Sequence, residues 1–93
     1  MSDLELKEKV YEGVIELAVS LTRQGRTMTS EELTTWITQH YSGFQHPYGN
    51  SRGVPQAAFL RAKTAGNHEG MDALVKAFTH SDGSHLWQEW RNL

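Results

Sequence analysis

The segment Met28–Tyr41, MTSEELTTWITQHY, carries the strongest structural signal in the chain. Thr29 and Glu32 have the spacing of a capping box, in which each side chain bonds the other residue's backbone N–H at the start of a helix. Met28 and Leu33 have the spacing of the matching hydrophobic staple. Large apolar residues then recur at i, i+3, i+4 and i+8, namely Leu33, Trp36, Ile37 and Tyr41. We therefore expect a helix to begin directly after Thr29 and to run to the end of this segment.

The preceding residues, Asp3–Gln24, have the pattern of a long amphipathic helix. Its apolar side comprises Leu6, Val10, Val14, Leu17, Ala18 and Leu21. The opposite side carries an acidic stripe formed by Glu5, Glu8, Glu12 and Glu16. Such a stripe is usually a solvated helix face, and the alternative is a docking surface for a basic partner. Gly13, in the middle of this helix, suggests that another helix approaches closely there.

On the other side of the central segment, a loop and a third helix follow. Ser42–Ser51 is rich in turn-forming residues, and we expect Phe44 and Tyr48 to pin this loop to the core. Val54–Ala65 has helical composition with a proline acceptable only in the first turn. Its inward side is predicted to consist of Ala58, Phe59, Ala62 and Ala65. Leu60 falls outside this pattern, on the polar side.

The remainder, from His68 to Leu93, admits two interpretations. Met71, Leu74, Val75 and Phe78 repeat with helical spacing. Residues 81–84 (SDGS) form a good hairpin turn, so residues 73–90 could be helix or hairpin. We expect a short fourth helix followed by a turn or a small hairpin. Trp87 and Trp90 either close the core or form an interface with a partner or a second copy of the chain.

These elements predict a mainly α fold in one domain, residues 1–93, built as a compact bundle of about four helices with a small C-terminal β-hairpin. The absence of cysteine excludes disulfides, a thiol nucleophile and thiolate zinc sites. No signal peptide, apolar span, catalytic motif or metal-ligand spacing is recognisable. We therefore expect a cytoplasmic protein that binds rather than catalyses, with no cofactor and no membrane association.

Acidic residues are absent from Leu33 to His68, although the chain as a whole has a formal net charge of −2. Three segments, RTMTSEELTTWI, SRGVPQAAFLRAKTAG and AFTHSDGSHLW, resemble the second helix, third helix and wing of the helix-turn-helix and winged-helix superfamily. The resemblance implies a small regulatory protein that binds double-stranded DNA, controls transcription and uses a dimer for affinity. It implies that Arg52 and Gln56 read base edges and that Arg61 and Lys63 hold phosphates.

A second hypothesis needs no nucleic acid. The chain would then be a protein–protein interaction module, such as an adaptor or an inhibitor. Its binding surface would be the acidic stripe or the aromatic residues Tyr48, Trp87 and Trp90.

Overall fold

A computed structural model describes residues 3–84, so the expectations for Trp87 and Trp90 lie outside the described residues. The elements along the chain are α1 (Asp3–Arg23), β1 (Met28–Thr29), α2 (Ser30–His40), α3 (Gly53–Thr64), α4 (His68–Ala77) and β2 (Phe78–Thr79). The mainly helical class and the four helices are confirmed.

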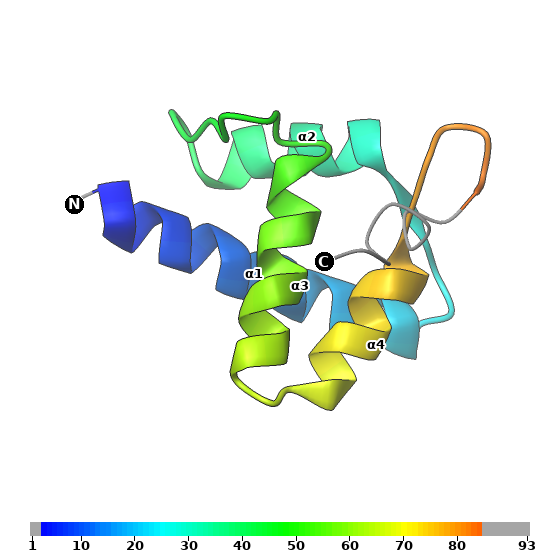
Figure 1. Cartoon of the computed structure of the whole chain (residues 1–93). Coiled ribbons are helices and arrows are strands. Elements are labelled where there is room, and N and C mark those ends of the chain that lie inside the picture. The colour runs from blue at the N-terminus through cyan, green and yellow to red at the C-terminus, as the bar shows by residue number, and fades with distance from the viewer. Residues whose placement is uncertain (1–2, 85–93) are drawn as a thin grey trace.

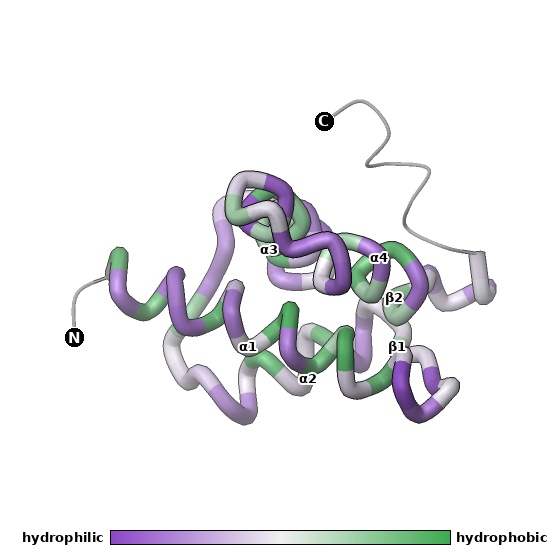
Figure 2. Tube along the Cα trace, turned by 90° about the horizontal axis from the view of Figure 1, so that it is seen from below, coloured by the Kyte–Doolittle hydropathy of each residue, from purple (hydrophilic) through white to green (hydrophobic). Residues whose placement is uncertain are grey.

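The helices form two layers. In Figure 1, α3 and α4 lie in front and both cross α1, while α2 runs along the top. Figure 2, turned by 90°, shows α3 and α4 together on one side and α1 and α2 on the other. The N-terminal end of α1 extends beyond α3 and α4 (Figure 1), whereas the C-terminal end contacts α4, where the Thr22 hydroxyl donates a bond to the Ala73 carbonyl at 3.5 Å.

One hydrophobic core unites these layers. Every helix contributes buried side chains, and the largest that are fully buried include Val10, Leu33, Ile37, Val54, Leu74 and Phe78. Small buried residues let the helices approach closely where they cross: Ala18, Ala58, Ala62, Ala73 and Ala77. The predicted inward side of α3 is correct except at Ala65, which caps the helix and is exposed. Leu60 lies on the outer side, as its place in the pattern predicted.

The start of α2 has the predicted capping box. The Thr29 Oγ1 accepts a hydrogen bond from the Glu32 N–H at 3.2 Å, and the Glu32 carboxylate accepts one from the Thr29 N–H at 3.0 Å. These bonds lower the pKa of Glu32. The packing of Leu33 and Ile37 in the core then fixes the orientation of the helix.

The first strand of the predicted C-terminal hairpin, β2, pairs with β1. Phe78–Thr79 pairs in parallel with Met28–Thr29, an arrangement that no local pattern predicted. The turn itself is present, closed by a bond from the His80 N–H to the Ser84 carbonyl at 2.7 Å. The segment that would return from this turn lies outside the described residues.

The loop between α2 and α3 is ordered by its own polar groups. The Asn50 side chain accepts a bond from the His46 N–H at 2.9 Å and donates one to the Phe44 carbonyl at 3.2 Å. The Gly49 N–H closes a four-residue turn on the His46 carbonyl at 2.9 Å. Phe44 packs against the core as predicted. Tyr48 does not, because 81% of its surface is exposed.

The imidazole of His46, rather than Tyr48, anchors this loop to the start of α3. Its Nδ1 accepts a bond from the Tyr48 N–H at 3.1 Å, and its ring lies 6.5 Å from that of Tyr11. The ring also lies so close to Gly53 that a Cβ at that position would overlap it. The first turn of α3 therefore depends on glycine at position 53.

Gly13 does permit a close approach, but by a side chain rather than by a helix. A Cβ on Gly13 would overlap the hydroxyl group of Tyr41, the residue that caps the end of α2. Tyr41 in turn packs edge-on against Trp36, with ring centroids 5.8 Å apart. The glycine thus lets the end of α2 rest on α1.

Candidate functional site

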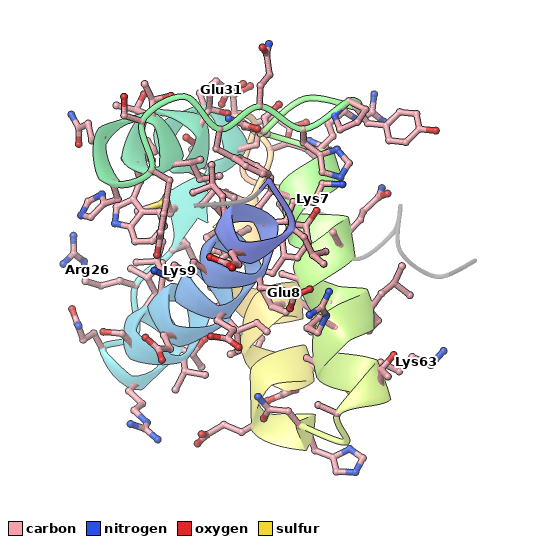
Figure 3. The ribbon with its side chains drawn as sticks, turned by 90° about the vertical axis from the view of Figure 1, so that its left-hand side faces the viewer. Lys7, Glu8, Lys9, Arg26, Glu31 and Lys63 are labelled. Carbon is pink, nitrogen blue, oxygen red and sulfur yellow. The ribbon has the colours of Figure 1, made fainter. Side chains whose placement is uncertain are left out.

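Three of the four residues predicted to bind DNA share one side of α3. Arg52, at the helix start, and Gln56 and Lys63 follow one another at helical spacing, and Leu60 lies among them. Lys63 points away from α1 (Figure 3). It makes no ion pair with a described residue. This outer face of α3 carries few cations for a surface that binds phosphates.

Arg61, the fourth predicted residue, is turned toward α1. It forms an ion pair with Glu8, which Figure 3 shows between α1 and α3. Its guanidinium also lies 5.7 Å from the centre of the Tyr11 ring, within the range of a cation–π contact. Its charge is therefore compensated within the protein.

The two helices joined by a short turn are α3 and α4. The resemblance assigned the motif to α2 and α3 instead. α2 and α3 are joined by residues 41–52, whereas α3 and α4 are joined only by Ala65, Gly66 and Asn67. Gly66 adopts a positive φ of 69°, which allows the sharp turn. The short glycine-containing turn typical of helix-turn-helix units thus precedes α4. Membership of that superfamily stays a prediction.

The acidic stripe of α1 does not act as one surface. Glu8 is engaged by Arg61, and Glu5 lies nearer the N-terminal end of the helix. Glu12 and Glu16 are exposed and, among residues 3–84, form no ion pair. These two carboxylates flank a depression between α1 and the α3–α4 turn.

We call this depression the α1 groove. It consists of two adjoining hollows of about 490 and 280 Å³ that share Ile15, Glu16 and Asn67. The hollows are also lined by Glu12, Val19, Ser20, Arg23, Gln24, Arg61, Ala62, Ala65 and Glu69. Half-buried Ile15 and Val19 form its apolar side on α1, and Ala62 contributes from α3.

Gly70 shapes the groove, although no sequence pattern singles it out. It is buried in the first turn of α4, where a Cβ would lie 2.6 Å from the Asn67 amide nitrogen and 3.0 Å from Ile15 Cγ2. The Asn67 side chain caps this turn by accepting a bond from the Gly70 N–H at 2.9 Å. A glycine here therefore allows α4 to start directly against α1.

The groove carries uncompensated negative charge along its middle. Ion pairs lie at its two ends, Glu8 with Arg61 and Arg23 with Glu69, the latter at 3.2 Å. Between them, among the described residues that line the groove, the remaining charged groups are the carboxylates of Glu12 and Glu16. The pKa of the Tyr41 hydroxyl is raised first by burial and then by the charges of Glu16 and Glu12.

Other kinds of site find less support in the described residues. Within residues 3–84, no three histidine, aspartate or glutamate side chains gather as a metal-binding group. None of the helices described here combines the length and apolarity that crossing a membrane requires. The groove and the outer face of α3 are therefore the candidate binding surfaces in the described part of the chain.

No protein-family model, curated protein or solved structure matches this chain.

Proposed function

We propose that this protein is a non-enzymatic interaction module that binds a segment of another protein in the α1 groove. The observation that carries the proposal is the groove itself, an elongated depression with an apolar side that no described segment of the chain occupies. Peptide-binding surfaces commonly combine such an apolar strip with polar borders, because the strip supplies affinity and the borders supply selectivity.

Charge distribution also favours a protein ligand over DNA. The outer face of α3 presents Arg52 and Lys63, while Arg61 would have to leave Glu8 to reach a phosphate. The helix after the short turn, α4, carries Glu69 and Asp72 near its start. Arg23 and Lys76 pair with these two carboxylates, so this helix start presents no net positive charge to phosphates, the groups that dominate DNA affinity.

A selection experiment tests the proposal without assuming the chemistry of the partner. A random 16-residue peptide library displayed on phage is selected on the immobilised full chain. We expect enriched peptides to compete with one another and to lose binding to Ser20→Tyr, because a tyrosine at this exposed position fills the groove. Gln39→Tyr, on the exposed side of α2, is the matched control and should bind normally.

Enrichment of no peptide, or peptides that bind Ser20→Tyr as well as the unaltered chain, would overturn the proposal. The same far-UV circular dichroism and melting temperature in both tyrosine variants would exclude misfolding as the cause of any loss.

DNA binding is a second candidate, supported by the shared outer face of Arg52, Gln56 and Lys63. Titration of mixed duplex DNA into ¹⁵N-labelled protein should then shift the amides around these residues, and the shifts should fade as salt rises. Lys63→Gln should weaken binding more than Lys76→Gln, because Lys76 is already paired with Asp72 at 2.8 Å. No shifts at low salt would reject this candidate.

A further inference from the structure

We infer that the occupant of the α1 groove is a cationic amphipathic helix of a partner protein, with apolar residues on one side and lysine or arginine flanking them. This inference rests on the proposed function and adds the chemical class and the conformation of the bound segment. Three features of the groove carry it: the composition of its walls, its length and the sign of its uncompensated charge.

The walls of the groove are helices, which determines the conformation of the segment bound there. The groove is lined by α1, α3, the α3–α4 turn and the start of α4, and none of these offers the open edge of a sheet. An extended peptide would find no strand there with which to pair its N–H and C=O groups. A helix satisfies these groups internally, so a helix is the conformation that this surface accommodates.

The length of the groove matches a short helix. The lining residues on α1 run from Glu12 to Arg23, which at about 1.5 Å per residue corresponds to about 16 Å. Three turns of a partner helix cover this length. Ile15 and Val19, one turn apart on α1, would contact apolar residues spaced three or four apart in the partner.

The charge of the groove selects a cationic helix. Glu12 and Glu16 are exposed and, within the described part of the chain, unpaired. The neighbouring Glu8–Arg61 and Arg23–Glu69 pairs are already neutral. A partner helix with carboxylates on its flank would be repelled, whereas lysine or arginine there would complement the two glutamates.

A pair of matched peptides tests the inference. The first is an 18-residue amphipathic helix made of leucine and lysine, and the second has the same pattern with glutamate in place of lysine. Each is titrated into the ¹⁵N-labelled full chain at low and moderate salt. We expect the Leu/Lys peptide to shift amides in residues 12–24 and 61–70, with affinity that falls as salt rises. The Leu/Glu peptide should leave them unchanged.

Isosteric variants identify the groups responsible. Glu12→Gln/Glu16→Gln removes both charges without changing size and should weaken Leu/Lys binding about fivefold, as expected for exposed charge pairs. Glu31→Gln, an exposed carboxylate on α2, is the control and should bind unchanged. All three chains should melt at similar temperatures, because these side chains are exposed.

Four results would overturn the inference: equal binding of the two peptides, shifts centred on another surface, an unchanged affinity in the double glutamine variant, and shifts of groove amides with protein concentration alone. The last would identify a second copy of the chain as the occupant. If the phage library yields groove-binding peptides without positive charge, this inference fails while the proposed function stands. If it yields none, both fail.

Discussion

The starts of α2 and α3 show two different ways of holding a helix end. α2 begins with reciprocal hydrogen bonds between Thr29 and Glu32, residues three positions apart. α3 begins after Arg52 with no side-chain cap, and its first turn is held by the loop that precedes it. There the His46 ring packs on Gly53. The first start depends on local sequence, and the second depends on how a loop is folded.

The largest expected effect comes from breaking the contact at the start of α3. In an ordinary helix, Gly→Ala stabilises by about 0.5–1 kcal/mol. At Gly53 the added Cβ would overlap the His46 ring, so we expect Gly53→Ala to destabilise by about 1–3 kcal/mol through overpacking. Urea denaturation of the purified variants measures this difference.

A double variant sharpens that result. In a His46→Ala background the clash is absent, and Gly53→Ala should become neutral or stabilising. Equal destabilisation in both backgrounds would show that His46 does not control the start of α3.

At the start of α2 the expected loss is smaller. Thr29→Ala removes the side-chain acceptor of the capping box and should lower the free energy of unfolding by about 1 kcal/mol. Thr29→Ser keeps the acceptor and serves as the control. Chemical denaturation of both variants at neutral pH decides the point, and an alanine variant as stable as the serine variant would contradict it.

The smallest expected effects concern the pH dependence of folding stability, which should differ between the two helix starts. Burial, and secondarily the charge of Lys7, lower the pKa of His46 from its usual 6.5. The unfolded chain therefore takes up this proton first, so the stability that His46 contributes is complete above about pH 6.5 and is lost as pH falls. The pKa of Glu32 is lowered from 4.5, first by its bond to the Thr29 backbone, so its contribution is lost only in more acidic solution.

Urea midpoints measured from pH 7.5 to pH 3 check these two windows. His46→Asn, which keeps an acceptor for the Tyr48 N–H, should flatten the decline that begins as the pH falls below about 6.5. Glu32→Gln should flatten only the decline below about pH 4.5. If the urea midpoint depends on pH in the same way in the unaltered chain and in both variants, the two helix starts do not differ in their pH dependence.

The candidate groove could be predicted only in part from the sequence. The acidic stripe was visible because four glutamates recur along one helix. The sequence did not show that Glu8 differs from the other glutamates of the stripe. Its ion-pair partner, Arg61, comes from a helix about fifty positions away along the chain. The apolar side of the groove was hidden because helical periodicity does not show that Ile15, which lies beside Gly70 of α4, stays half-buried.

The sequence by itself determined what depends on neighbours within one or two turns. This includes the capping box of α2, the amphipathic pattern of α1 and the exposed position of Leu60. Short-range hydrogen bonds and helical periodicity are sufficient for these features.

Only the tertiary structure decided what depends on how distant segments cross. This includes the parallel pairing of Met28–Thr29 with Phe78–Thr79, the orientation of Arg61 and the contact of Tyr41 with Gly13. The α1 groove belongs to the same class. It exists because the α3–α4 pair covers only part of the apolar side of α1, and the angle of that crossing is set by the packing of the whole core.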